Sequence, residues 1–324
     1  MSIVNKLKEK ILAGEQIDKA DAMALLDAPL EELARAADEL REKFCGNGFD
    51  LCTIVNAKCG KCSEDCKYCA QSAHYHTACE KSYPLLSTEA ILAQAKKNAE
   101  QGVLRYSIVT SGKRLSDAEI DRVCEAIREI RTQTSLQVCV SIGLQNEEQF
   151  RRIKDAGATR AHCNLEASRR YFPQVCTTHT FDQKIETLKA AKRAGLSICS
   201  GGIMGLGETM EDRIDMVLAA REIGATSVPV NLLTPIPGTP YEKNRKLTND
   251  ELCRIVAIFR FIMPRSAIRL AGGRGLLGDK GEKCFRSGAN ATISGDMLTT
   301  SGISTATDKQ LLASLGYEAR LSND

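Results

Sequence analysis

The sequence has little net charge, no long apolar run and no low-complexity segment. Its 44 basic and 41 acidic side chains leave a formal charge of +3, which is too small to indicate a nucleic-acid or anionic-membrane partner. No apolar stretch approaches the roughly 20 residues that span a bilayer. We therefore expect a protein that binds neither nucleic acid nor a membrane.

The N-terminus also lacks the pattern of a secretory signal. In MSIVNKLKEKILAGEQ, lysine and glutamate occupy positions where a signal peptide needs a continuous apolar core. We therefore expect a cytoplasmic protein. In that reducing compartment, its 14 cysteines indicate metal binding or catalysis and not disulfides.

Apolar periodicity indicates an alternation of strands and helices. Residues 4–43 have helical spacing, and after them short apolar runs alternate with further helical segments. Several of these helices end in Ala-Gly or Ile-Gly, which is typical of a helix stop. The expected strands are 50–56, 104–110, 136–143, 159–166, 196–205, 227–233, 267–273 and 291–298.

Eight strands that alternate with helices predict an α/β fold, a parallel (β/α)8 barrel of the TIM type. We expect an N-terminal helical extension over residues 1–45, followed by the barrel with a C-terminal cap over residues 46–324. A doubly wound open sheet is the alternative. Barrels of this kind place their chemistry at the carboxyl ends of the strands, and polar residues do follow several of the predicted strands.

Four cysteines, at positions 59, 62, 66 and 69, lie within eleven positions after the first predicted strand. A zinc site made of two CxxC pairs separates the pairs by about 15–20 residues, whereas only three residues separate Cys62 from Cys66. The subset Cys62, Cys66 and Cys69 could hold three corners of a four-iron cluster and leave one iron open for a small molecule. A structural metal knuckle is the alternative, and Cys59 is then a spare ligand.

The CxxxCxxC spacing after a first strand, with Tyr68 before the last cysteine, resembles the radical S-adenosylmethionine enzymes. The resemblance implies a 4Fe–4S cluster on Cys62, Cys66 and Cys69, whose free iron binds S-adenosylmethionine. Reductive cleavage would then release a 5′-deoxyadenosyl radical that abstracts hydrogen from the substrate. No protein side chain is assigned as catalytic, because the radical forms at the cofactor.

Later segments narrow the resemblance to the biotin synthase family. They are CSGGIMGLGET (199–209), SVPVNLLTPIPGTP (227–240), IRLAGGRG (268–275) and GANATISGDMLTTSG (288–302). The resemblance implies a sulfurtransferase that converts dethiobiotin to biotin, with an auxiliary iron–sulfur cluster in the barrel as sulfur donor. It also implies a homodimer and an electron donor such as flavodoxin or ferredoxin.

The resemblance assigns Cys139, Cys199 and Arg269 to the auxiliary cluster, but Ser107 stands where the family has a cysteine on the second strand. Cys163 on the fourth strand could supply the missing thiolate, so the auxiliary cluster is either a 2Fe–2S cluster or a four-iron variant. Alternatively, Cys163 is a small buried hydrophobic residue.

The resemblance also assigns the two small molecules to residues of this chain. The S-adenosylmethionine positions are Tyr68, Glu166 and Lys184, and the dethiobiotin positions are Asn164, Asn231, Thr299 and Thr300. Glu166 replaces an aspartate that binds the ribose, Lys184 replaces an arginine that holds the methionine carboxylate, and His162 replaces an asparagine that contacts the substrate.

The other cysteines and histidines receive no role in the site. Cys52, Cys59, Cys79 and Cys176 stay open because their loops could approach the barrel mouth, and His74, His76 and His179 are expected on the surface or in packing. Two other functions remain. One is a related barrel enzyme of the hydrogenase-cofactor maturase or methylornithine synthase type, and the other is a non-enzymatic iron–sulfur protein.

Overall fold

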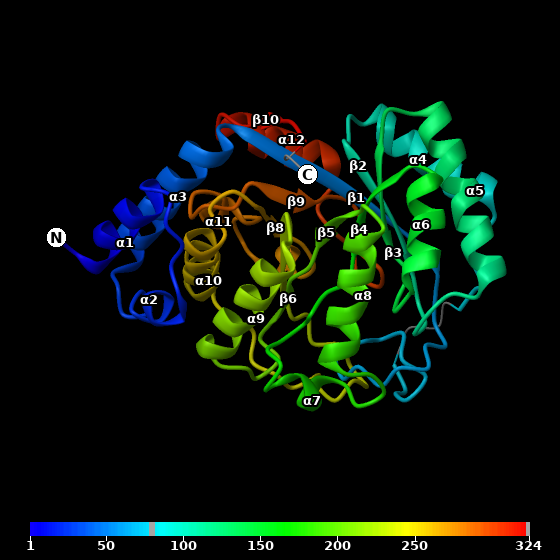
Figure 1. The fold of residues 1–324 in the computed structure, drawn as a ribbon, viewed down its shortest axis with the longest axis horizontal. Helices are drawn as coiled ribbons and strands as arrows, with labels where there is room; N and C mark the ends of the chain where they lie inside the picture. The colour runs from blue at the N-terminus through cyan, green and yellow to red at the C-terminus, as the bar shows by residue number, and fades with distance from the viewer. Residues whose placement is uncertain (78–81, 322–324) are drawn as a thin grey trace.

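The computed structural model describes residues 1–77 and 82–321, so Cys79 lies outside the described residues. Parallel strands stand at the centre of the molecule, and most helices lie around them (Figure 1). Within the described part of the chain, none of the helices combines the length and the apolar character that a membrane crossing requires.

The central strands form a barrel that closes on itself. In order around the wall they are β1 (Gly48–Lys58), β2 (Arg105–Thr110), β3 (Gln137–Ser141), β4 (Ala158–His162), β5 (Ser197–Cys199) with β6 (Gly202–Met204), β7 (Ser227–Leu232), β8 (Ala267–Leu270) and β9 (Ala291–Ile293). β1 pairs in parallel with both β2 and β9, and these two pairings close the sheet. The predicted (β/α)8 barrel is confirmed, and the open sheet is excluded.

The outer helices begin where the sequence offers a capping side chain. α4 (Thr88–Glu100), α5 (Asp117–Gln133), α6 (Glu147–Asp155), α8 (Phe181–Arg193), α9 (Met210–Ile223) and α10 (Asn249–Ile262) follow successive strands. Each N-cap is serine, threonine or asparagine, and its side chain accepts a hydrogen bond from a backbone N–H of the first turn. These caps fix where each loop at the barrel mouth ends.

The fifth predicted strand, 196–205, is split into β5 and β6. Close backbone packing at Gly201, between the two strands, and at Gly202, the first residue of β6, explains the break. A Cβ at Gly201 would lie 2.0 Å from the carbonyl oxygen of Pro229, and a Cβ at Gly202 would lie 2.4 Å from that of Glu166. Only glycine permits such close backbone approach, so the strand bends between its neighbours on β4 and β7.

Three N-terminal helices, α1 (Ile3–Leu12), α2 (Lys19–Met23) and α3 (Leu30–Cys45), lie outside the barrel wall at one end of the molecule (Figure 1). α3 and α1 pack on α10, and α2 packs on α9. The start of α2 is fixed by a capping box formed by Asp18 and Asp21. The division of the chain into 1–45 and 46–324 stays a prediction.

Several short elements were not predicted from the sequence. They are α7 (Phe172–Val175), η1 (Arg274–Leu276), α11 (Glu282–Phe285), α12 (Thr305–Ser314) and β10 (Glu318–Ala319). β10 pairs with the start of β1 and therefore extends the sheet at the amino end of that strand. A buried ion pair of 2.6 Å between Arg274 Nη2 and Asp308 Oδ2 fastens α12 to the loop after β8.

Candidate active site

One cavity of 410 Å³ extends from the carboxyl ends of the strands into the barrel. Its wall follows the period of two that a strand imposes, since Cys52 and Ile54 line it from β1, and Ser107 and Val109 line it from β2. The loop that carries the CxxxCxxC motif follows β1 and lines the mouth of the same cavity. The motif and the interior of the barrel therefore share one space.

The CxxxCxxC loop is held by its own backbone. Cys62 N donates to Gln71 O at 3.0 Å, Ala73 N donates to Cys62 O at 2.8 Å, and Cys69 N donates to Cys66 O at 3.0 Å. All three cysteines line the cavity, and burial is the main cause that raises the pKa of Cys69 to about 11. Three thiols at one cavity, with no fourth cysteine of this loop lining it among the described residues, fit a cluster with one open iron.

The side chain of Glu166 lies beside this loop. The hydroxyl of Tyr68 donates to Glu166 Oε1 at 2.9 Å, and the backbone of Glu166 has a φ of 70°, which turns the chain after β4. The other carboxylate oxygen, Oε2, is buried and has no hydrogen-bond partner among the described residues. A buried acceptor without a donor is costly, so this oxygen fits a ligand hydroxyl such as that of a ribose.

Lys184 on α8 adds a positive charge to the cavity that Glu166 also lines. It is 8% exposed. Burial works against its charged form, but the nearby acidic groups Cys163, Glu166 and Cys66 outweigh burial and raise the pKa of Lys184. A buried ammonium beside the motif fits an anionic group of a bound cofactor.

The two predicted substrate asparagines both hydrogen-bond the backbone at the start of β6. Asn164 Oδ1 accepts from Gly201 N at 3.1 Å, and Asn231 accepts from Gly272 N at 2.9 Å and donates to Gly202 O at 3.1 Å. These bonds fix both amide planes against the backbone. Thr299 and Thr300 line the cavity from the loop after β9, so the four predicted substrate residues border one space.

Three buried thiols line the barrel interior, on β1, β3 and β5. They belong to Cys52, Cys139 and Cys199, and we call them the inner thiols. Burial is the first cause that raises the pKa of Cys139 to about 12 and that of Cys52 to about 11, and each lies close enough to Cys199 to feel its charge. A metal ion that bound these sulfur atoms would displace their protons and offset the repulsion between the resulting thiolates.

Below the inner thiols, four charged side chains fill the amino end of the barrel, and we call them the basal charge layer. Asp50 lies 3.1 Å from Arg269, 3.5 Å from Arg105 and 3.8 Å from Arg160 between charged atoms. Because three guanidinium groups surround one carboxylate, the layer carries an excess of positive charge beneath the inner thiols. Such an excess favours thiolates above it.

Ser107 and Cys163 differ in their surroundings. Ser107 is buried beside Cys139 in the β2–β3 register, so it lies near the inner thiols as the sequence predicts. Cys163 lines the cavity just beyond β4, and the charged groups that act on it are Lys184 and Glu166. On β4 it is the preceding residue, His162, that contacts Cys199, with 3.4 Å between Nδ1 and Sγ.

Sequence reasoning left three features of the site without a role. Cys52 shares the inward face of β1 with Ile54, and the period of two along the strand could have revealed it. The basal charge layer could not be found in this way, because it depends on register across the barrel. Cys176 and His179 lie beside Cys66, and only their CxxH spacing hints at this contact.

Comparison with known proteins agrees with this geometry. Residues 58–220 match the Radical SAM superfamily, and residues 229–318 match the Biotin and Thiamin Synthesis associated domain. The first match starts at the end of β1 and includes the CxxxCxxC loop, Glu166 and Lys184. The second includes Asn231, Arg269 and the two threonines after β9.

Solved structures of similar fold have low sequence identity to this chain. Methylornithine synthase superposes with a TM-score of 0.84 at 20% identity and covers 98% of both chains. The FeFe-hydrogenase maturase from Carboxydothermus hydrogenoformans superposes with a TM-score of 0.82 at 18% identity, over 97% of this chain and 78% of the maturase. At such identity these structures support the barrel fold alone.

Curated relatives resemble the chain over nearly its full length. The biotin synthase of Brachyspira hyodysenteriae is 56% identical over 99% of this chain and 96% of its own length. That of Akkermansia muciniphila is also 56% identical, over 99% of this chain and 100% of its own length. With the CxxxCxxC loop, the predicted substrate asparagines and the inner thiols around one cavity, this chain belongs to the biotin synthase family within the radical S-adenosylmethionine superfamily.

Proposed function

We propose that the chain converts dethiobiotin to biotin by radical insertion of sulfur, with S-adenosylmethionine as co-substrate. The observation that carries the proposal is the single 410 Å³ cavity. It brings together the motif cysteines, Glu166, the substrate asparagines and the inner thiols. A carbon radical formed in such an enclosed space is protected from solvent and lies beside its sulfur source.

Cys62, Cys66 and Cys69 would hold the 4Fe–4S cluster that the superfamily implies. When bound there, the cluster supplies the electron that cleaves S-adenosylmethionine. The protein orients this co-substrate, because Glu166 Oε2 is free to accept from a ribose hydroxyl and Lys184 can pair with the methionine carboxylate. Tyr68 holds the carboxylate of Glu166 in place through its 2.9 Å hydrogen bond.

Dethiobiotin is a ureido ring with a carboxylate chain, and the cavity offers a matching pattern. Asn164 and Asn231 have fixed amide groups that can hydrogen-bond a ureido group. Thr299 and Thr300 offer hydroxyl and backbone donors for the carboxylate at the other end. The backbone bonds of both asparagines orient them before substrate arrives, which lowers the entropic cost of binding.

The inner thiols and Arg269 support a proposal for the auxiliary iron–sulfur cluster. Cys139 and Cys199 would bind it with Arg269, and Cys52 would provide the third thiolate that Ser107 cannot. Cys163 is the other candidate for that thiolate. Iron counting and Mössbauer spectra of Cys52→Ala and Cys163→Ala would distinguish them, because loss of auxiliary iron in one variant identifies the ligand. The same spectra would tell a two-iron from a four-iron cluster.

A homodimer, a cytoplasmic location and an electron donor such as flavodoxin or ferredoxin complete the proposal. They rest on membership of the family, whose curated relatives match this chain over nearly its full length. Size-exclusion chromatography of the reconstituted protein would test the dimer.

Anaerobic reconstitution with iron, sulfide, S-adenosylmethionine, a reductant and dethiobiotin tests the reaction. We expect biotin, 5′-deoxyadenosine and methionine as products. Cleavage of S-adenosylmethionine without biotin would indicate a related barrel enzyme with another substrate. Absence of cleavage in protein that holds its iron would indicate a non-enzymatic iron–sulfur protein.

A further inference from the structure

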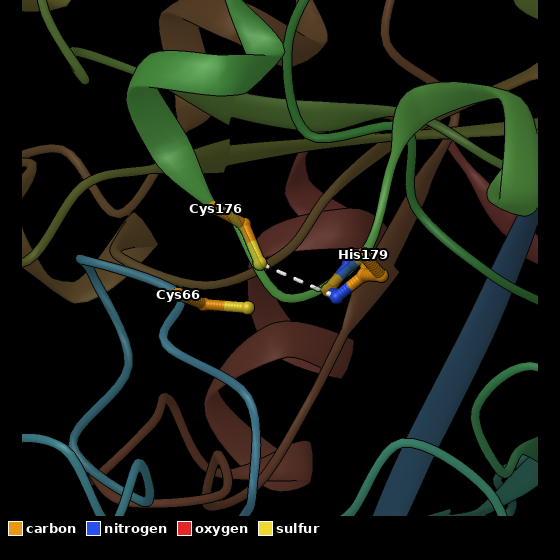
Figure 2. Close-up of side chains that lie close together, drawn as sticks. All are labelled: Cys66, Cys176 and His179. Carbon is orange, nitrogen blue, oxygen red and sulfur yellow. Dashed lines mark hydrogen bonds between the residues drawn. The ribbon is translucent and has the colours of Figure 1, made fainter.

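Cys66, Cys176 and His179 form a cluster of metal-binding atoms at the edge of the cavity. The two sulfur atoms and a ring nitrogen of His179 all lie within 4.8 Å of one another. Figure 2 shows that Cys66 comes from the CxxxCxxC loop, that Cys176 and His179 come from the loop after α7, and that the side chains turn toward one another. Of these three residues, only Cys66 has a role in the proposed reaction.

The loop after α7 is fastened to the CxxxCxxC loop by its backbone. Asp65 Oδ1 accepts from Thr177 N at 2.8 Å and from Thr178 N at 3.1 Å, and Lys67 N donates to Val175 O at 2.9 Å. The relative position of Cys66 and Cys176 is therefore set by the fold and does not depend on a chance side-chain orientation. Both Cys176 and His179 are buried.

The distances between these atoms suit a tetrahedral metal ion. Cys176 Sγ lies 3.2 Å from His179 Nδ1, close to the ~3.6 Å edge expected when sulfur and nitrogen bind one ion at ordinary bond lengths. A carboxylate also contacts the cluster, because Glu64 Oε2 lies at a hydrogen-bond distance of 2.6 Å from the same nitrogen. Two thiols, an imidazole and a carboxylate suit a borderline-soft divalent cation and not calcium or magnesium.

We propose that Cys66, Cys176 and His179 bind one thiophilic divalent cation, of the class of Fe²⁺ or Zn²⁺, in the chain that lacks its radical cluster. Binding replaces the thiol protons of Cys66 and Cys176, which pass to solvent, and no oxidant or reductant takes part. Because Cys66 cannot serve the ion and the cluster at once, the two exclude each other. This exclusion rests on the proposed cluster role of Cys66, whereas the ion site itself does not.

Cobalt(II) is a suitable probe because its thiolate complexes absorb in the visible and near ultraviolet. The iron-free, reduced, full-length chain is titrated with Co²⁺ alone under anaerobic conditions. We expect Cys176→Ala and His179→Gln each to bind one equivalent fewer than the unchanged chain, with loss of a tetrahedral ligand-field band. Cys124→Ala, which removes another buried thiol from α5, is the matched control and should bind as the unchanged chain does.

The motif cysteines could bind Co²⁺ by themselves, and a double variant decides between the sites. Under the proposal, the double variant Cys62→Ala/Cys69→Ala still binds one equivalent of Co²⁺ at the proposed site, which Cys176→Ala no longer binds. If the double variant loses this equivalent of Co²⁺ while Cys176→Ala and His179→Gln still bind it, the proposal is overturned. Circular dichroism verifies folding, and His179→Gln alone decides if Cys176→Ala fails to fold.

Zinc provides the test of exclusion. Pre-binding one equivalent of Zn²⁺ should slow reconstitution of the radical cluster in the unchanged chain, and it should have little effect in His179→Gln. Equal rates of reconstitution with and without Zn²⁺ would contradict the exclusion. Neither experiment contains dethiobiotin or S-adenosylmethionine, so a negative result here leaves the proposed reaction standing, and failure to form biotin leaves the ion site standing.

Discussion

His162 on β4 and Cys199 on β5 lie opposite each other in register, with 3.4 Å between Nδ1 and Sγ. Burial opposes ionisation of this thiol, but the imidazole and the guanidinium groups of Arg160 and Arg269 outweigh burial and lower the pKa of Cys199 to about 6. Cys139, one of the other inner thiols, has a pKa raised to about 12. These two inner thiols therefore differ in how readily they ionise.

Replacing His162 should weaken the auxiliary site and spare the radical cluster. In His162→Asn, Cys199 loses its nearest polar partner, and outer partners of metal ligands contribute roughly 10–100-fold to metal affinity. We expect a chelator to remove the auxiliary iron at a concentration roughly 10–100-fold lower, while the 4Fe–4S absorption persists. His74→Asn, on the exposed part of the CxxxCxxC loop, is the control. Equal loss of both clusters would contradict the assignment.

Glu166→Gln should lower the affinity for S-adenosylmethionine. The variant keeps the size of the side chain but loses the negative charge that would accept from the ribose, and hydrogen bonds to charged groups contribute about 1.5–3 kcal/mol. We therefore expect binding weaker by roughly 10–100-fold, measured by calorimetry on the reconstituted protein. Tyr68→Phe removes only the supporting bond and should have a smaller effect. Unchanged affinity in Glu166→Gln would remove Glu166 from the cofactor site.

Gly202→Ala should destabilise the barrel where the segment after β4 approaches β6. The added Cβ would lie 2.4 Å from the carbonyl oxygen of Glu166, and forced backbone shifts of this kind cost about 1–3 kcal/mol. Gly275→Ala is the matched control, since its Cβ would meet no atom within 4 Å. Urea unfolding of the two iron-free variants compares their free energies. A Gly202→Ala variant as stable as Gly275→Ala would disprove the clash.

Asp212 should contribute acid-sensitive stability at the start of α9. Its carboxylate accepts from Ser168 Oγ at 2.6 Å, Thr209 N at 2.9 Å and Arg170 Nε at 3.1 Å. Burial opposes its ionisation, but these donors outweigh burial and lower the pKa of Asp212 from 3.8 to about 2. The folded state thus favours the ionised form. This preference raises the free energy of unfolding by about 2 kcal/mol when the pH lies above the unfolded pKa.

That stabilisation is present at pH 7 and is lost as the pH falls from about 4 through about 2. Asp212→Asn should therefore be less stable than the unchanged chain at pH 7, and the difference should shrink in acid. Denaturant unfolding at a series of pH values measures this, with the exposed Asp155→Asn as control. A difference that stays constant with pH would show that Asp212 acts through packing alone.

The barrel itself could be predicted because its signals are local. Each outer helix has its own capping residue, as Ser116 and Thr248 show, and each strand is a short apolar run between such helices. The break at Gly201 and Gly202 was not predicted, because it depends on contacts with Pro229 on β7 and with Glu166 in the segment after β4. A single-strand pattern does not contain these contacts.

The candidate site likewise has one part that the local sequence predicts and another part that depends on contacts between strands. The spacing of Cys62, Cys66 and Cys69 within one loop was enough to predict a cluster with an open iron, and the three do line one cavity. The inner thiols come from β1, β3 and β5, so their meeting depends on barrel register. The strand pattern can place Cys52 on the inward face of β1, but it cannot show which thiols Cys52 meets there, so the role of Cys52 stayed open.

The basal charge layer has a consequence for how small molecules reach the inner thiols. Asp50, Arg105, Arg160 and Arg269 are each at most 2% exposed, so the amino end of the barrel is shut to small molecules. Whatever reaches the inner thiols must enter by the mouth, past the positions proposed for substrate and co-substrate. Under the proposed function, the substrate and the source of replacement sulfur would therefore reach the inner thiols by the same route, and the product would have to leave before new sulfur could pass.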